Sequence, residues 1–469
     1  MPVKPPSRTQ PTAVPIFAIK WQTSPAIIPS HVLAYAGGGG SAKTGIGNTV
    51  SIQIDQQNIT IDTGVEIAVC IDVLITQSKL IYLAVGVRDS VRVYLMDQEN
   101  SEAIQVSNVD LEKDAGVNAV AWNSFGDSIG VGCENGSAHV LSVEFEEDNK
   151  LKMQQVIELK GHIKAVCSCV YHPRNPEVLM TSAKDGTCRV WNLQMNNEDK
   201  CMDTLDCKIY DPKGPKPKAN ILNPKPGQCL VRGCAFGDFH GNVIYTIQSG
   251  RKGGAFLSVW NLTRRAVPGE TENPRNNPNG QPVPKMVYEF KEALRRQVSK
   301  FPVSAMSLSG DFTTLALGDT DGSITLLNAE RDFKKIKFWE CAHDLPVTCI
   351  AARPLPVPLS GEDLTGVAVD AISASADNKL TYVTKQRKST LKKPKRKKTG
   401  GKYQRESLGL FYPIYVLLFL MIVYAIKVSY DVCHDEFTGE DGIDNVKHCL
   451  LHTVLWAESD RPGVAFIPH

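Results

Sequence analysis

Signatures of enzyme chemistry are missing from this 469-residue sequence. It has no nucleophile elbow, no H-E-x-x-H, no protein-kinase motif set and no paired C-x-x-C. It also lacks an excess of one charge sign, with 52 Lys and Arg against 50 Asp and Glu. No global field therefore marks it as a nucleic-acid or acidic-ligand binder. We expect a protein that acts by binding, is not an enzyme and uses no organic cofactor.

A secretory signal is also missing, because the first 22 residues carry five prolines and no apolar core segment. One uncharged run, SLGLFYPIYVLLFLMIVYAI at 407–426, is long enough to cross a bilayer as a helix. A buried core helix is the alternative. Eleven Lys or Arg precede the run and a net-acidic tail follows it. The positive-inside rule then predicts four segments: a cytosolic domain (1–385), a basic juxtamembrane linker (386–406), a transmembrane helix (407–426) and a lumenal tail (427–469).

The densest part of the basic linker, Lys392–Lys398, reads KKPKRKK. Such a cluster is typical of nuclear localisation signals and nucleic-acid patches. Beside a membrane span, it is also an orientation signal that attracts anionic headgroups. We favour the membrane interpretation and expect no nucleic-acid partner.

Eleven of the 13 cysteines are scattered before the span, as expected of free thiols in a reducing compartment. Cys433 and Cys449 lie in the tail, where oxidation can join them in a disulfide.

The first 385 residues repeat one pattern. A short apolar strand ends in small residues, a tight polar turn follows, and an alternating strand completes the unit, as in LMTSAKDGTCRVWNL at 179–193. The turns contain Asp185-Gly186, Asn135-Gly136 and Asp321-Gly322, dipeptides that allow positive φ in a hairpin. Gly161-His162 and Trp191-Asn192 bracket one unit in the manner of a WD repeat.

Seven such units can be counted, at 14–62, 66–106, 115–160, 161–206, 227–291, 301–340 and 345–385. A four-stranded unit cannot bury both its faces alone, but radial packing of seven units buries them. The sequence therefore predicts an all-β, seven-bladed WD-repeat-like β-propeller followed by one transmembrane helix. A pair of β-sandwiches is the competing fold. Two Pro-rich insertions, 208–227 and 264–285, are expected to be solvent loops.

The first unit contains an anomalous connection. Strands 31–36 and 49–54 are separated by twelve residues, of which six are glycine. GGGGSAKT at 37–44 nearly fits a phosphate-binding loop, but an alternating strand follows where such a loop needs a helix. Two interpretations stay open: a flexible hairpin tip, and a contact loop whose exposed carbonyls converge on a cation or a partner.

This G-G-G-G-x(4)-G-I-x-N loop, the seven divergent repeats and the single late span resemble the endoplasmic-reticulum guanine-nucleotide exchange factors for the Sar GTPase. The resemblance implies that the protein loads this GTPase with GTP at the endoplasmic-reticulum membrane and so starts COPII vesicle formation, with coat components as indirect partners. A membrane-tethered scaffold, or a nucleic-acid-binding regulator, is the alternative.

The resemblance also implies the site. Backbone carbonyls of Gly37, Gly38, Gly39 and Gly40, together with Asn48, would hold a potassium ion. Asn48 would act in exchange. The remaining residues of the loop would contact the GTPase: Ser41, Ala42, Lys43, Thr44, Gly45, Ile46 and Gly47. Gly47 stands where yeast-like members of the family usually have proline, which implies a less pre-organised loop. As the last residue of a hairpin loop, Asn48 is expected to support little of the core.

Overall fold

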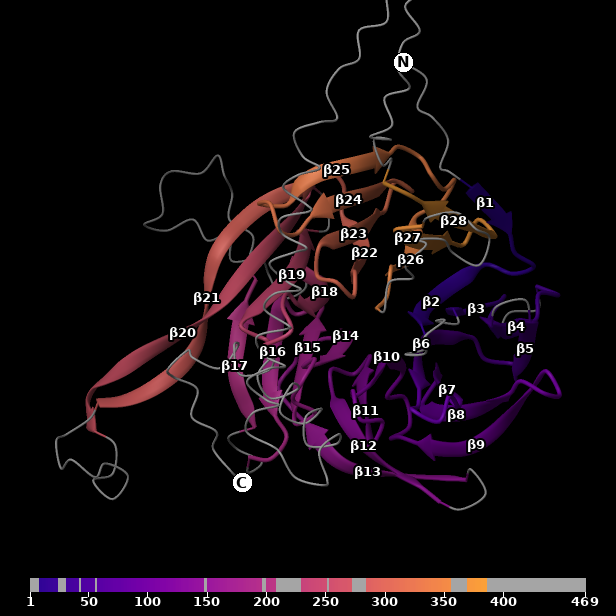
Figure 1. The fold of residues 1–469 in the computed structure, drawn as a ribbon, viewed down its shortest axis with the longest axis horizontal. Coiled ribbons are helices and arrows are strands. Elements are labelled where there is room, and N and C mark those ends of the chain that lie inside the picture. Colours follow the sequence, from indigo (N-terminus) through magenta and orange to yellow (C-terminus); the bar gives the residue numbers. More distant parts are fainter. Residues whose placement is uncertain are drawn as a thin grey trace, which may run out of the picture. The chain divides into compact units, whose positions relative to one another are not determined.

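Seven four-stranded antiparallel sheets arranged in a ring form the blades of a β-propeller (Figure 1). The computed structural model describes ten segments, all within the first of two compact units, Met1–Arg387: residues 8–23, 31–41, 44–54, 57–146, 150–195, 200–207, 229–250, 253–271, 284–355 and 369–385. Among them no helix has the length and hydropathy of a membrane span. The predicted span and the segments flanking it, 386–469, lie outside the described residues.

Each blade uses four strands, and the first strand of each lies nearest the centre in Figure 1. Blades one to three contain β2 (Ile16–Thr23), β3 (His31–Gly37), β4 (Asn48–Ile54) and β5 (Gln57–Gly64); β6 (Ala68–Ile75), β7 (Ile81–Val87), β8 (Ser90–Asp97) and β9 (Glu102–Asp110); β10 (Val117–Trp122), β11 (Ser128–Cys133), β12 (Ala138–Phe145) and β13 (Leu151–Leu159). Blades four and five contain β14 (Val166–Tyr171), β15 (Val178–Ala183), β16 (Thr187–Asn192) and β17 (Cys201–Asp206); β18 (Cys229–Phe236), β19 (Val243–Gly250), β20 (Ala255–Thr271) and β21 (Pro284–Ser299). Blades six and seven contain β22 (Val303–Leu308), β23 (Thr314–Asp319), β24 (Ile324–Asn328) and β25 (Lys334–Trp339); β26 (Val347–Ala352), β27 (Ala371–Ser375), β28 (Lys379–Val383) and the N-terminal β1 (Arg8–Pro11). The predicted seven-bladed propeller is confirmed.

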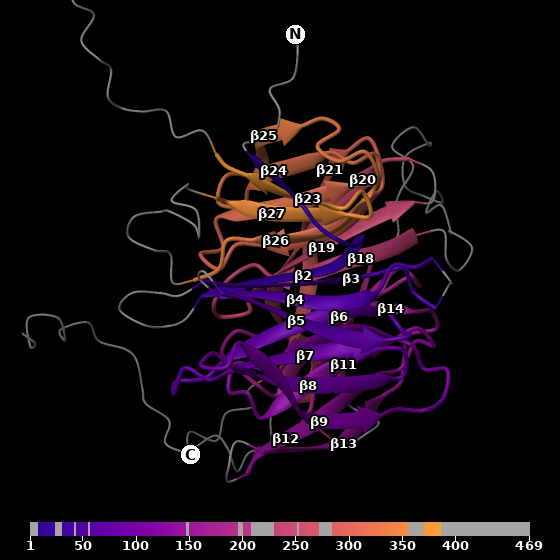
Figure 2. The same ribbon diagram turned by 90° about the vertical axis from the view of Figure 1, so that its right-hand side faces the viewer.

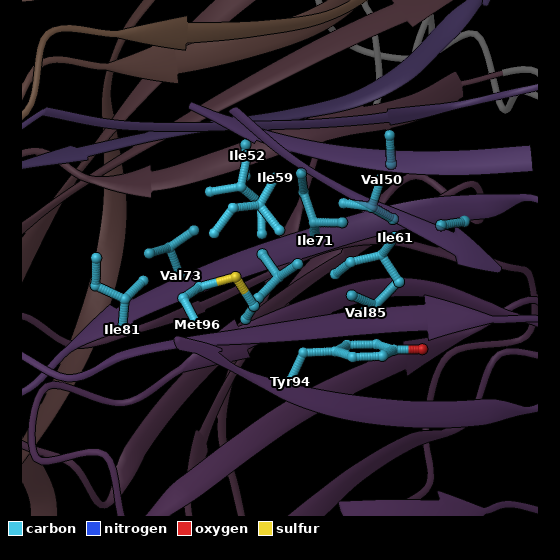
Figure 3. Close-up of a cluster of buried hydrophobic side chains, with 14 of the residues drawn as sticks. Val50, Ile52, Ile59, Ile61, Ile71, Val73, Ile81, Val85, Tyr94 and Met96 are labelled. Carbon is cyan, nitrogen blue, oxygen red and sulfur yellow. The ribbon is translucent and has the colours of Figure 1, made fainter. Parts of the chain in front are cut away.

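Burial follows the position of a strand in its blade. Every residue of β3, β7 and β27 is buried, since these strands are covered on both faces by neighbouring blades. The outermost β5 alternates buried and exposed residues, because only one of its faces is covered. Seven apolar clusters fill the spaces between consecutive blades. In the first, Ile52 and Ile59 of the first blade face Ile71 and Val73 of the second (Figure 3).

The chain closes the ring with its own beginning. β1 pairs with β28 from Arg8 opposite Tyr382 to Pro11 opposite Lys379. The Tyr382 hydroxyl also donates to Gln10 Oε1 at 3.0 Å. The predicted units started at residue 14 and so missed this strand. A four-residue segment that ends in proline has too short an alternating pattern to indicate a strand, but at a sheet edge proline is tolerated.

The second Pro-rich insertion is in part a strand and not a loop, which corrects the prediction. β20 continues to Thr271 and β21 begins at Pro284, and the pair extends beyond the ring in Figure 1. Pairing continues along this arm from Ala255 opposite Ser299 to Thr271 opposite Pro284. Cross-strand pairing therefore outweighs the turn-forming composition. The first insertion, 208–227, lies outside the described residues.

The strands run across the ring from one face to the other (Figure 2). In each blade the second strand ends at the face where the first strand begins, because the two strands are antiparallel. Examples are β3, which pairs with β2, and β23, which pairs with β22. This face therefore carries the β3–β4 connection, and we call it the loop face. β28 runs in the opposite direction to β27, so the chain leaves Val383 at the other face.

Candidate functional site

The β3–β4 connection stands out by length among the seven equivalent connections of the loop face. It occupies residues 38–47, whereas the others have two to four residues, from 88–89 in the second blade to 134–137 in the third. The predicted twelve-residue loop is shorter by one residue at each end. Gly37 belongs to β3 opposite Thr49, and Asn48 belongs to β4 opposite Gly64.

The base of this loop is packed against its surroundings. A Cβ atom on Gly37 would lie 1.8 Å from the Pro15 carbonyl oxygen, and one on Gly38 would lie 2.3 Å from Asn48 Oδ1. The Gly38 amide donates to the Pro15 carbonyl at 3.0 Å. Gly40 has a φ of +71°, a left-handed conformation that glycine adopts without strain. Glycine is therefore required at the base by close backbone approach, and the base is not a flexible hairpin tip.

Asn48 holds the base of the loop in place. Its side chain is buried, with 3% of the residue exposed. Oδ1 accepts from the Gly40 amide at 2.8 Å, and Nδ2 donates to the Gly40 carbonyl at 3.2 Å. The same Nδ2 lies 3.0 Å from the Gly64 carbonyl and 2.8 Å from that of Val65. Asn48 thus joins the loop to the β5–β6 connection, which corrects the expectation that it supports little of the structure.

Two neighbouring side chains support this clamp. The Thr63 hydroxyl lies 2.9 Å from the Glu66 carbonyl and 3.2 Å from that of Asn48. Arg88 Nη1 lies 3.6 Å from Glu66 Oε1, an exposed pair of small energetic weight. The β5–β6 turn therefore has contacts of its own besides those with Asn48, and the loop is held against this turn.

The tip of the loop is exposed. Ser41, Thr44, Gly45, Ile46 and Gly47 all lie at the surface, and Ala42 and Lys43 lie outside the described residues. Ile46 exposes 39% of its surface, and Val65 on the adjoining turn exposes 71%. The Ile46 amide donates to Thr44 Oγ1 at 3.3 Å. Exposed Ile46 and Val65 beside a fixed loop base are suited to contact with another protein, because an ordered base loses little entropy on docking.

Of the predicted potassium ligands, Gly40 and Asn48 are hydrogen bonded to each other. The carbonyls that converge here, those of Gly40, Gly64 and Val65, converge on Asn48 Nδ2, which is a hydrogen-bond donor. An ion at that point would have to displace the amide. Gly37 and Gly38 are packed against Pro15 and Asn48. Potassium binding stays a prediction of the resemblance, and no step of the proposed mechanism depends on it.

Two buried polar networks on the loop face hold other blades together. His162 Nδ1 lies 3.0 Å from Asp185 Oδ2, and His162 Nε2 lies 2.8 Å from Thr181 Oγ1, to which Trp191 Nε1 also donates. Burial of Asp185 raises its pKa, but hydrogen bonding and the charge of His162 outweigh this and lower it to about 2. Gly161-His162 and Trp191-Asn192, the pairs that marked this unit as WD-like in the sequence, supply the histidine and tryptophan of this network.

The seventh blade repeats the network without tryptophan. His343 Nδ1 lies 3.1 Å from Asp377 Oδ1, and Nε2 lies 2.8 Å from Ser373 Oγ. Burial lowers the pKa of His343. Sequence reasoning missed these residues, because Ala342 and Val383 occupy the positions of the glycine and tryptophan that mark a WD repeat. A histidine four residues before a first strand was the available signal.

Comparison with known proteins agrees with this architecture. Residues 153–192, from β13 to β16, match the model of the family described as WD domain, G-beta repeat. A crystal structure of Chaetomium thermophilum Sqt1 bound to the N-terminus of the ribosomal protein L10 is similar at 15% identity and a TM-score of 0.51. The match covers 79% of this chain and 97% of that one. A second Chaetomium thermophilum Sqt1 structure gives 15% identity, a TM-score of 0.49, and coverage of 79% and 96%. The chain is therefore an all-β, seven-bladed propeller in which residues 153–192 match a WD repeat, and at this identity the likeness to Sqt1 concerns the fold alone.

Proposed function

We propose that this propeller is a guanine-nucleotide exchange factor for a Sar-type small GTPase. It would act at the endoplasmic-reticulum membrane and start COPII vesicle formation. The sequence resemblance is to the animal branch of these factors, the prolactin regulatory element-binding proteins. The observation that carries the proposal is the 38–47 loop, whose exposed tip is held on a base that Asn48 joins to the β5–β6 connection.

Exchange of this kind needs no bond chemistry. A factor that binds the nucleotide-free GTPase more tightly than the GDP-bound form must lower the affinity for GDP by the same factor. Cytosolic GTP then refills the site. The fixed base would let contacts at Ile46 and its neighbours act on the GTPase instead of deforming the loop. Asn48 would be a positioning residue, since its amide is buried and fully hydrogen bonded.

Other properties of the chain fit a protein-binding role. Sqt1 binds a segment of another protein, and we extend to this propeller only the general use of the fold as a protein-docking platform. The sequence supplies the membrane tether, with the basic linker 386–406 before the apolar run 407–426. Tethering would confine exchange to one membrane, where the loaded GTPase inserts its own amphipathic helix.

A binding assay tests the proposal through its thermodynamic consequence. The purified full-length chain should capture nucleotide-free Sar-type GTPase more tightly than the GDP-bound form, by roughly 5- to 150-fold if the coupling is typical. Ile46→Ser should weaken capture of the nucleotide-free form. Ile336→Ser is the matched control, because Ile336 on β25 is 37% exposed, close to the 39% of Ile46. Equal affinity for the two GTPase forms would contradict the proposal.

The alternative is a tethered propeller scaffold without exchange activity. It is distinguished by stable binding of the GTPase or another protein with no change in nucleotide affinity. Potassium is tested separately: a lower exchange rate in lithium than in potassium at equal ionic strength would confirm the ion, and equal rates would exclude it.

A further inference from the structure

The sixth blade departs from the fourth and seventh at one structural position. Asp319 of the sixth blade lies opposite Val303 on the first strand. Ala183 lies opposite Val166 in the fourth blade, and Ser375 lies opposite Val347 in the seventh. Asp319, Ala183 and Ser375 therefore occupy equivalent positions. Four residues before each of these valines lie Ser299, His162 and His343, respectively. The sixth blade therefore has a serine where the other two have a buried imidazole, and an acid where they have a small residue.

This difference in residue type leaves a buried carboxylate of the sixth blade without a full set of hydrogen-bond partners. Asp319 is 1% exposed. Ser299 Oγ donates to its Oδ2 at 2.7 Å. Its Oδ1 has no hydrogen-bond partner among the residues that the structure describes. A buried carboxylate oxygen without a donor is costly, so this oxygen calls for a partner such as water, an ion or a ligand.

Asp319 lines an open cavity of about 530 Å³ between the fifth and sixth blades, on the loop face. Phe301 and Phe338, 49% and 40% exposed, also line it. The charged residues of the lining are three acids and two lysines: Asp319, Asp321, Glu340, Lys300 and Lys335.

The other charged groups are already engaged or exposed. Asp321 accepts from the Ser323 amide and hydroxyl at 3.0 Å each. Lys335 Nζ stands 4.6 Å from the centre of the Phe338 ring, and no ion pair joins it to Asp319 in the part of the chain described. Burial, reinforced by the charge of Asp321, raises the pKa of Asp319 to about 6. At neutral pH the carboxyl is therefore ionised but poorly compensated.

We propose that this cavity is a docking pocket for the cationic side chain of a protein partner, with arginine as the best fit. A guanidinium group would donate to Asp319 Oδ1, the oxygen that has no hydrogen-bond partner among the described residues. Its planar face would stack on an exposed phenyl ring, to which cations are attracted. The open cavity of about 530 Å³ has room for an arginine side chain carried on a peptide or loop.

The test uses N-acetyl-arginine methylamide as the probe and saturation-transfer NMR on the full-length chain at pH 7.5. The neutral isostere N-acetyl-citrulline methylamide is the ligand control. We expect the arginine probe to bind and the citrulline probe to bind at least about tenfold more weakly, equivalent to about 1.4 kcal/mol. Equal binding of the two probes would overturn the proposal.

Two substitutions test the location. Asp319→Asn keeps the shape of the side chain and should lower affinity for the arginine probe at least about tenfold. Ser299→His should also lower it, by placing an imidazole in the cavity. Glu330→Gln removes one exposed acid of the same blade outside the cavity and should leave binding unchanged. Retained binding by both Asp319→Asn and Ser299→His would place the probe elsewhere and refute the assignment.

Discussion

Replacement by asparagine should change the stability of the propeller in opposite directions at two buried aspartates of the loop face. Asp319 has one oxygen without a partner, whereas Asp185 accepts from Ile163, Thr187 and His162. Replacement by asparagine removes the charge at nearly constant shape. We expect Asp319→Asn to stabilise the propeller at neutral pH and Asp185→Asn to destabilise it.

The magnitude follows from the pKa of each carboxyl. Burial raises the pKa of Asp319 to about 6, about two units above that of an unfolded aspartate, so its ionisation opposes folding by about 3 kcal/mol above pH 6. Because the folded pKa is raised, this loss is absent below about pH 4 and develops as the pH rises to about 6. For Asp185, with a pKa of about 2, the carboxylate stabilises above about pH 4, by about 2–3 kcal/mol, and the stabilisation is lost as the pH falls toward 2.

Thermal melting of the full-length chain measures both effects. For a propeller of this length, 3 kcal/mol corresponds to a change in Tm of about 4 °C. Asp319→Asn should raise the Tm by that amount at pH 7.5 and leave it unchanged at pH 4. Asp185→Asn should lower the Tm at pH 7.5. The reasoning is refuted if Asp319→Asn lowers the Tm at pH 7.5, or raises it equally at both pH values.

Three further outcomes are expected. Deletion of residues 1–12 removes β1, so the ring should open beside Tyr382, and limited proteolysis should cut the seventh blade faster than in the intact chain. Asn48→Asp should lower stability by about 2–4 kcal/mol and more than Asn48→Ala, because a carboxylate oxygen would face three carbonyls; melting curves of the pair decide this. A new glycosylation sequon near Gly439 should be modified in cells while the exposed Asn261 is not; glycan on Asn261 would contradict the proposed topology.

The sequence was sufficient for the blades because each hairpin is specified locally. Gly136, Gly186 and Gly322 all have the positive φ, from +82° to +95°, that their turn dipeptides predicted. The alternation of apolar and polar residues then predicted the strands on either side of each turn. The glycine-rich connection was also visible, because its length broke a regular pattern.

Features that depend on contacts distant in sequence were not predictable. The Asn48 clamp needs the carbonyls of Gly64 and Val65, which local pattern does not connect to it. The site at Asp319 differs from the fourth and seventh blades because a histidine of those blades is absent from the sixth. The equivalent positions can be matched only from the strand register. The β1–β28 pairing joins opposite ends of the propeller.

The most direct test of the central claim is the rate of fluorescent GDP release from a Sar-type GTPase. The full-length chain should accelerate release, and Asn48→Ala should slow the accelerated rate at least about tenfold, or about 1.4 kcal/mol. Asn135→Ala, in the shorter loop-face turn of the third blade, is the control and should exchange at the wild-type rate. No acceleration by the wild type would contradict the proposed function. Wild-type exchange by Asn48→Ala would contradict the role of the clamped loop.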